Sequence, residues 1–377
     1  MKYSDIRDML RAEGKESIAL DLLRGNEIIE TSISPEKINL QSSKIAYTLK
    51  EGVGYIKVDR FSSNTYKEFM EGLEVLAEKE KIKHLVIDLR DNPGGYLPEA
   101  INILSQLFDE KEKLLVYTEG KSEKKLEYKT TGKNFFPIDK IAVLINESSA
   151  SGSEIIAGAI QDWDRGVIIG RRSYGKGLVQ EQYPLRNGGA IRLTISRYFT
   201  PSGRSIQRPY DNLSDYQDDI DARHTSGELY DLDKYLLTDS TEYKTMNLAR
   251  SMYGGGGIIP DVYIPLDSTI YHDYMSYLED YIPEYVFQNR EKGWTYGKER
   301  IVVDEFLDYV EKKNPDIRNR DSLDRIELIK RIRSQLAYQE LGELEREKVL
   351  NESDPFIEEA LKYTLSSIGM ASYIDIH

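Results

Sequence analysis

Ser151 and Lys176 are the two residues of this chain whose types and settings fit a nucleophile and its base. Ser151 lies in the phrase Asn-Glu-Ser-Ser-Ala-Ser-Gly-Ser-Glu, residues 146–154, and Lys176 lies in Ser-Tyr-Gly-Lys-Gly-Leu-Val-Gln, residues 173–180. A serine hydroxyl becomes a strong nucleophile when a base takes its proton, and a desolvated lysine amine can be that base. The pair predicts acyl transfer through a serine.

The surroundings of Ser151 predict a turn between a strand and a helix. A short apolar run, 141–145, precedes it, and residues 152–161 carry apolar side chains at helical spacing. The free N–H groups at the start of a helix favour negative charge on an attacked carbonyl oxygen. Serines before a helix are also common N-caps, so this phrase alone does not establish catalysis.

The surroundings of Lys176 favour a role in chemistry over a place on a polar surface. It lies between Gly175 and Gly177, which leave room for close approach of a substrate, and just before a strand-like run, 178–183. Gln180 follows four residues later, and its amide oxygen could accept a hydrogen bond from the lysine amine and orient it.

A phosphate-binding loop is the competing interpretation of the same glycines. Residues 170–177 read Gly-Arg-Arg-Ser-Tyr-Gly-Lys-Gly, which is close to G-x-x-x-x-G-K-[ST]. Gly177 replaces the hydroxyl that would hold magnesium, and a strand-like segment follows where that loop needs a helix. The sequence therefore disfavours nucleotide binding.

A third polar phrase, residues 88–96, follows the apolar strand predicted over 84–89. It reads Asp-Leu-Arg-Asp-Asn-Pro-Gly-Gly-Tyr, a tight bend with exposed amides. The amides of Gly94 and Gly95, together with that of Gly152, are candidate oxyanion donors. Taken alone, the phrase also fits an ordinary turn between a strand and a helix.

With these three phrases in order, the chain resembles the C-terminal processing peptidases, or tail-specific proteases, which are serine peptidases with a Ser/Lys dyad. Residues 198–207, Tyr-Phe-Thr-Pro-Ser-Gly-Arg-Ser-Ile-Gln, and 257–262, Gly-Ile-Ile-Pro-Asp-Val, look like later signatures of that family. The resemblance implies these roles: Ser151 as nucleophile, Lys176 as base, Gln180 as its orienter, Gly94, Gly95 and Gly152 as oxyanion hole, and Glu154, Asp162 and Ser173 as supporting residues. Ser173 stands where a threonine is usual, and it keeps the hydroxyl.

Composition excludes several other classes of function. The 377 residues carry a formal net charge of −14 and no basic stripe, so nucleic acid is not an expected partner. The absence of cysteine excludes thiol nucleophiles and disulfides. The acidic residues are scattered without ligand spacing, and the four histidines support no catalytic scheme, so we expect neither metal nor cofactor.

The first 34 residues predict a helix over 3–11 and a hairpin of two strands, 17–23 and 27–33. In the resembled family, the end of a PDZ domain holds this position, so residues 1–34 are expected to be the C-terminal remnant of one. The front of such a domain would lie before Met1, and the peptide groove would then be incomplete in this chain.

The remainder predicts an α/β (α+β) protein. A strand over 55–58, a helix over 66–80 with Phe69, Leu73 and Leu76 inward, and the strand over 84–89 alternate along the chain. The resemblance narrows this to a crotonase-like mixed sheet-and-helix core over 35–265.

Two further regions complete the expected organisation. An insertion rich in Asp, Tyr and Ser, 209–253, is expected to be a loop or small subdomain at the surface. A helical region follows over 266–377. Its apolar stripe is expected to pack into a core, although a dimer contact or a lid remains open. The stripe consists of Leu323, Ile326, Ile329, Ile332 and Leu336.

The function expected by resemblance is a serine endopeptidase that cleaves proteins near accessible C-terminal tails. The alternative is a degenerate homologue that binds tails without cutting. No apolar run reaches the roughly 20 residues of a membrane span, and Met1-Lys2-Tyr3-Ser4 begins no signal peptide. The resemblance nevertheless implies the periplasm or cell envelope of a bacterium, and self-association is left open.

Overall fold

The computed structural model describes residues 17–24, 27–36, 41–121, 123–210, 216, 218–235, 241–267, 273–315 and 324–375. These divide into two compact units, Met1–Gln41 and Ser42–His377. The first unit contains the predicted hairpin, whose antiparallel strands are β1 (Ile18–Arg24) and β2 (Glu27–Ile33). The helix predicted over 3–11 lies outside the described residues.

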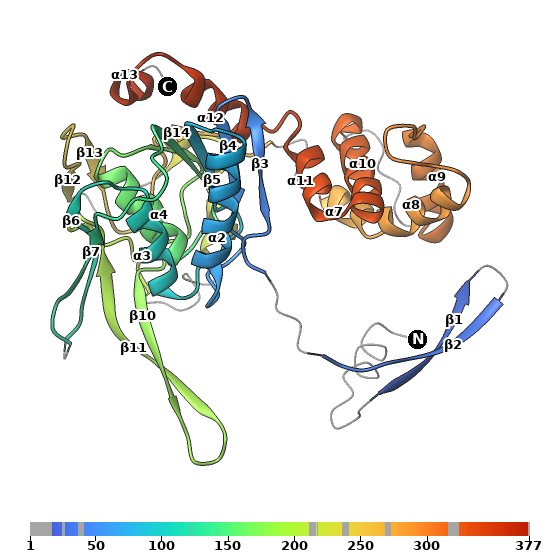
Figure 1. Ribbon diagram of the computed structural model, residues 1–377, viewed down its shortest axis with the longest axis horizontal. Helices are drawn as coiled ribbons and strands as arrows, with labels where there is room; N and C mark the ends of the chain where they lie inside the picture. Colours follow the sequence, from blue (N-terminus) through green and yellow to red (C-terminus); the bar gives the residue numbers. More distant parts are fainter. Residues whose placement is uncertain are drawn as a thin grey trace. The chain divides into compact units, whose positions relative to one another are not determined.

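A six-stranded mixed sheet is the centre of the second unit (Figure 1), in the order β14-β9-β8-β5-β4-β3. All neighbouring pairs are parallel except β3 and β4. The central strands are apolar and almost fully buried, as expected for a sheet covered on both faces. The strands are β3 (Ile45–Lys50), β4 (Val53–Lys57), β5 (His84–Asp88), β8 (Lys140–Ile145), β9 (Val167–Gly170) and β14 (Val262–Tyr263).

Helices cover both faces of this sheet. On one face, α2 (Thr65–Glu74), α3 (Leu97–Gln106) and α4 (Gly152–Asp162) pack into the larger apolar core. On the other face, Phe356 and Ile357 of α12 (Pro355–Leu365) pack against the sheet. Helix α2 continues as a π-helical turn, η1 (Val75–Lys79), and the three residues predicted to face inward, Phe69, Leu73 and Leu76, are buried. The expected α/β class is confirmed.

A second, antiparallel sheet has the order β10-β11-β6-β7. Its strands β10 and β11 form a long hairpin that extends from the core (Figure 1), and β10 is an edge strand. The predicted run 178–183 is the main part of β10. The strands are β6 (Lys111–Glu119), β7 (Leu126–Thr131), β10 (Leu178–Pro184) and β11 (Ala190–Phe199).

The insertion at 209–253 contains regular secondary structure, which fits the small subdomain of the two expected alternatives better than a loop. It forms a helix, a 3-10 turn and a small antiparallel pair, and Arg223 of the helix is only 2% exposed, so this part is not purely a surface feature. The elements are α6 (Asp219–Ser226), η2 (Leu232–Lys234), β12 (Glu242–Lys244) and β13 (Ser251–Tyr253).

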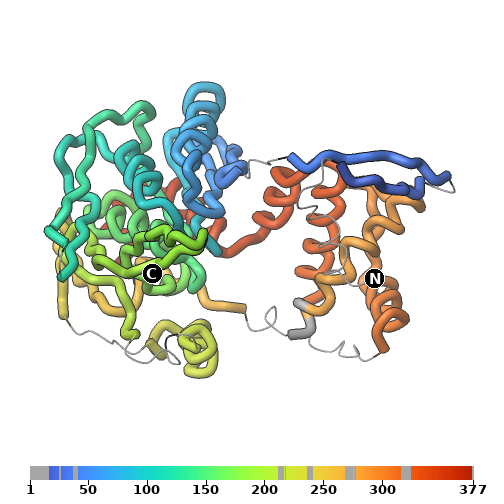
Figure 2. Tube along the Cα trace, turned by 90° about the horizontal axis from the view of Figure 1, so that it is seen from below, coloured from blue at the N-terminus to red at the C-terminus, as the bar shows by residue number. Residues whose placement is uncertain are grey.

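The C-terminal helices build a separate apolar core, and Figure 2 shows α8, α9 and α10 packed side by side. The predicted stripe is partly wrong: Ile332 and Leu336 are buried, but Ile326 is 81% exposed. Leu328 replaces it, because residues four apart stay on one face of a long helix. Leu323 lies outside the described residues. The helices are α7 (Asp273–Glu279), α8 (Ile282–Glu291), α9 (Val303–Lys313), α10 (Arg325–Leu341), α11 (Glu343–Asn351) and α13 (Met370–Ile374).

Candidate active site

The three polar phrases meet because each follows the carboxyl end of a neighbouring parallel strand. Strand β5 leads to the turn with Gly94, β8 leads to Ser151, and β9 leads to Lys176. Carboxyl ends of parallel strands meet at one edge of a sheet, where ligands bind in open α/β folds. This order explains how residues far apart in sequence reach one place.

Ser151 has a strained backbone at the start of α4. Its φ is +55° and its ψ is −108°, a conformation that side chains with a Cβ rarely adopt. The residue is half-buried, and the helix begins at Gly152. The turn therefore exposes the hydroxyl beside the free amides of the first helical turn.

The buried carboxylate of Glu154 connects the turn of Ser151 to the loop of Lys176. Its Oε2 accepts hydrogen bonds from the backbone N–H of Ser151 at 2.8 Å and of Lys176 at 2.9 Å. Its Oε1 accepts from the N–H of Gly175 and from the hydroxyl of Ser173, both at 2.6 Å. One side chain thus fixes the two candidate catalytic residues relative to each other.

Burial raises the pKa of Glu154, and the four donors around it act in the opposite direction. Ser173 also accepts a hydrogen bond from the N–H of Ile258 at 2.7 Å, so its hydroxyl ties the loop to the 257–262 phrase. Both residues thus lie where a supporting role requires them to lie, within the connection between the serine and the lysine.

Tyr198 is a site residue that sequence reasoning missed. Its hydroxyl donates to the carbonyl oxygens of Ser151, at 3.1 Å, and of Lys176. The side chain is buried, and burial raises its pKa well above the usual value for tyrosine. Tyr198 belongs to β11, so a strand of the second sheet fixes the same two backbones that Glu154 connects. The only sequence signal was its position at the start of the 198–207 phrase.

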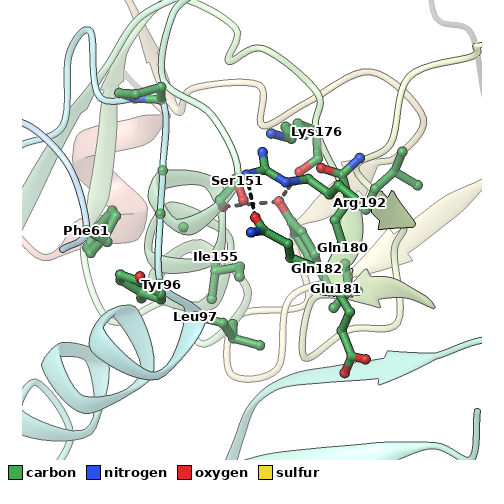
Figure 3. Close-up of a pocket in the computed structure, with 17 residues that line it drawn as sticks. Phe61, Tyr96, Leu97, Ser151, Ile155, Lys176, Gln180, Glu181, Gln182 and Arg192 are labelled. Atoms are coloured by element: carbon green, nitrogen blue, oxygen red, sulfur yellow. Dashed lines mark hydrogen bonds between the residues drawn. The ribbon is translucent and has the colours of Figure 1, made fainter. Parts of the chain in front are cut away.

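Ser151 and Lys176 line one open cavity of about 770 Å³ (Figure 3). The cavity lies between the Gly94 turn, the start of α4 and the edge strand β10. Its lining residues are Phe61, Pro93, Gly94, Gly95, Tyr96, Leu97, Ser151, Gly152, Ile155, Lys176, Leu178, Val179, Gln180, Glu181, Gln182, Arg192 and Tyr198.

The amide of Gly94 does not serve as an oxyanion donor in this structure, because it donates to Oδ1 of Asn92 at 2.9 Å. Gly94 instead permits close packing: a Cβ there would lie 2.6 Å from the Cβ of Ser151. Within the part of the chain that the structure describes, the amides of Gly95 and Gly152 have no acceptor. The predicted oxyanion hole is therefore reduced to these two groups.

The structure brings Gln180 to the cavity but not to the lysine. Its side-chain amide donates to the hydroxyl of Thr194 at 3.4 Å, across the β10–β11 pair, and the residue is exposed. Among the described residues, no hydrogen bond joins Ser151 to Lys176, and no carboxylate forms an ion pair with Lys176. The half-buried lysine therefore lies beside the serine without a charged partner.

Asp162 lies outside the cavity, at the opposite end of α4 from Ser151. It is fully buried, its Oδ2 accepts from the N–H of Ser202 at 2.9 Å, and its Oδ1 lies 2.8 Å from the guanidinium of buried Arg204. Its contacts stabilise the turn after β11. No group of His, Asp or Glu in the described ranges has the arrangement of a metal site.

Comparisons with known proteins identify a class of protein that the chain resembles. Residues 52–216 match the sequence model of Peptidase family S41. The chain is 30% identical over 198 residues to the "Probable CtpA-like serine protease" of Staphylococcus epidermidis, and 34% identical over 204 residues to the "Carboxy-terminal-processing protease" of Bartonella bacilliformis. These matches cover 52% and 53% of this chain, and 40% and 46% of the relatives.

Among solved structures, the chain is similar to a photosystem II D1 C-terminal processing protease, with 30% identity and a TM-score of 0.40 over 48% of this chain and 49% of that one. The match of residues 52–216 to the family S41 model confirms the resemblance found in the sequence. The chain spans less than half the length of the two curated relatives. No helix in the described ranges is long and apolar enough to span a membrane.

Proposed function

We propose that this protein is a serine endopeptidase in which Ser151 is the nucleophile and Lys176 the general base. The observation that carries the proposal is the shared cavity: the serine, the lysine and the uncommitted amides of Gly95 and Gly152 all line it. Its openness to solvent leaves room for an extended peptide, and its position at the strand ends suits a binding site.

The proposed reaction has two steps. In the first, the proton of the Ser151 hydroxyl passes to the neutral amine of Lys176 while Oγ bonds to the carbonyl carbon of the substrate. The C–N bond then breaks, and the leaving amine takes that proton. In the second, water gives a proton to Lys176 as its oxygen bonds to the ester carbon. The bond from that carbon to Oγ then breaks, and the protonated amine returns the proton to Oγ, which releases the carboxyl product and restores the serine and the neutral lysine. The amides of Gly95 and Gly152 would stabilise the negative oxygen in both steps.

The surroundings of Lys176 support its role as a base. A carboxylate partner would hold the amine in its charged form, and among the described residues none is paired with it. Glu154 interacts instead with the backbone of the lysine loop, which positions the residue without neutralising its side chain. We propose that Gln180 orients the amine only when a substrate has changed the packing along β10, since its amide contacts Thr194 in this structure.

The substrate class proposed from the family is a protein or peptide with an accessible C-terminal tail. We further propose a crotonase-like core over 35–265 and a C-terminal remnant of a PDZ domain over 1–34. The predicted hairpin within 1–34 supports the latter. The bacterial relatives support a location in the cell envelope.

The proposal is tested with a purified, loosely folded protein substrate that has an apolar C-terminal tail. Wild-type protein should cleave it, and Ser151→Ala and Lys176→Ala should each lose nearly all activity while retaining their fold. Lys176→Arg should also fail, because a guanidinium stays protonated. Ser367→Ala is the matched control, since that serine is exposed, lies outside the cavity and should be dispensable.

Retention of most activity in Ser151→Ala would refute the mechanism. Binding of the tail by wild-type protein without any cleavage would favour the non-cutting alternative. A parallel assay with free and amidated forms of one tail peptide tests the proposal of a PDZ remnant, which predicts little discrimination between the two forms. A strong preference for the free tail would show that carboxylate recognition lies elsewhere in this chain.

A further inference from the structure

A second cavity, of about 560 Å³, adjoins the candidate active site. It shares Pro93, Lys176, Leu178 and Gln180 with the first cavity, so the two cavities adjoin at the lysine. Its remaining wall is mostly aromatic and aliphatic, and part of that wall comes from the insertion. The other lining residues are Ser148, Ala150, Tyr174, Tyr210, Tyr216 and Ile220.

Arg208 holds the aromatic part of this wall in place. Its guanidinium lies 3.9 Å from the ring centre of Tyr174 and 4.1 Å from that of Tyr216. It also donates to the carbonyl oxygen of Tyr216 at 2.8 Å and pairs with Asp219 of α6. Arg208 is only 3% exposed, so these cation–π contacts are shielded from water. The wall is a built feature with fixed rings.

The lining chemistry selects one type of side chain. Among the described residues, no carboxylate lines the cavity, and Lys176 is the one cation that does. A basic side chain would meet a like charge without a partner, and an acidic one would pair with the lysine and hold it in its charged form. An apolar or aromatic side chain would contact the tyrosine rings and Ile220, and its burial would displace water without leaving a charge unpaired.

We propose that this cavity, the aromatic subsite, binds an apolar or aromatic side chain of one of the two residues that flank the bond to be cut. This inference rests on the proposed peptidase function. Because Tyr210, Tyr216 and Ile220 belong to the insertion at 209–253, the insertion then determines substrate preference at the reacting centre. Lys176 lies at the boundary of both cavities, so a side chain in the subsite would place its backbone next to the base.

The test uses matched fluorogenic peptides that differ only at one flanking position, with Phe, Leu, Gly, Lys or Asp there. Wild-type kcat/KM should favour Phe and Leu over Gly and Lys by about tenfold or more at one of the two positions. Tyr216→Ala should reduce that preference to about threefold or less, because the ring contact is lost. Tyr216→Phe and Tyr230→Ala are the controls and should keep it, since the first retains the ring and Tyr230 lines neither cavity.

A second variant fills the subsite, whereas Tyr216→Ala enlarges it. Ile220→Phe narrows the subsite and should lower cleavage of the Phe peptide while leaving the Gly peptide unaffected. If Ser151-dependent cleavage is intact but neither variant changes the preference at either position, the subsite is refuted and the peptidase function stands.

Binding to the Ser151→Ala protein separates the two claims if wild-type protein cleaves none of the peptides. Affinity for the Phe peptide should then fall about tenfold when Tyr216→Ala is added, while affinity for the Gly peptide stays constant. That outcome supports the subsite although the peptidase proposal fails. Equal losses for both peptides, or no binding of either, would overturn the subsite.

Discussion

Replacing Glu154 by glutamine tests whether one buried carboxylate positions both candidate catalytic residues. The carboxylate accepts four hydrogen bonds, two on each oxygen. A glutamine side chain keeps one oxygen and places an NH2 group against the other pair of donors. In the better orientation, the NH2 group replaces the oxygen that accepts from Ser173 and Gly175. The hydroxyl of Ser173 can rotate and accept a hydrogen bond from this NH2 group, but the N–H of Gly175 is left without an acceptor.

The expected loss in stability follows from this count. One unsatisfied buried amide costs about 1–3 kcal/mol, and the remaining bonds weaken because the acceptor is no longer ionised. We therefore expect Glu154→Gln to lower the free energy of unfolding by about 2–4 kcal/mol. Displacement of the lysine loop relative to Ser151 by about 1 Å should also lower kcat/KM by about 100-fold.

Urea unfolding and peptide hydrolysis measure the two effects on the same protein samples. Glu181→Gln is the matched control, because that carboxylate also lines the cavity but is exposed and bonds only to Tyr183 among the described residues. It should change the free energy of unfolding by less than about 0.5 kcal/mol. If Glu154→Gln were as stable and as active as this control, the connecting role of Glu154 would be wrong.

Three further outcomes are expected. Ser151→Gly should be more stable than Ser151→Ala by about 1 kcal/mol in thermal or urea unfolding, because glycine adopts the positive φ without strain; equal stabilities would contradict the strained turn. Tyr198→Phe should lower the free energy of unfolding by about 1–2 kcal/mol and kcat/KM by about tenfold, because two carbonyl oxygens lose their donor; a fully active variant would remove Tyr198 from the site. The raised pKa of Glu154 means that the folded state holds this proton more tightly than the unfolded state, whose pKa is about 4.3. The contribution of this proton to stability is therefore complete below about pH 4.3 and declines as the pH rises through the pKa of Glu154 in the folded state. The difference in free energy of unfolding between wild-type protein and Glu154→Gln should thus shrink from about pH 4 to about pH 7.5 in urea titrations. A difference that grows over this range would contradict the direction of the pKa shift.

The sequence predicted the elements that position the site because their signals are local. Buried parallel strands read as short apolar runs, and the turns after them contain glycine, proline and serine. Ser151 and the Gly94 turn were placed at the ends of such runs, and Lys176 was placed just before the strand-like run 178–183; the structure brings all three to one cavity. The strand β9 that leads to Lys176 was not predicted. The helix after Ser151 was predicted for the same reason, to within one residue of its end.

What the sequence did not predict depends on contacts between distant segments. The hydroxyl of Tyr198 reaches the site from the second sheet, and no pattern near residue 198 indicates its partners. The bond from Gly94 to Asn92 depends on the rotamer of one side chain. Arg223 of the insertion donates to carbonyl oxygens of the segment before Lys176, which explains why a polar segment expected at the surface is partly buried.

The most direct test of the central claim is the identification of the acylated residue. A fluorophosphonate forms a stable bond to an activated serine oxygen with loss of fluoride, and intact-mass and peptide mass spectrometry locate the adduct. The account predicts one adduct per chain, on Ser151, that is absent in Ser151→Ala, much slower in Lys176→Ala and unchanged in Ser367→Ala. An adduct that persists in Ser151→Ala, or no adduct on wild-type protein that cleaves its substrate, would contradict the assignment of Ser151 as the nucleophile.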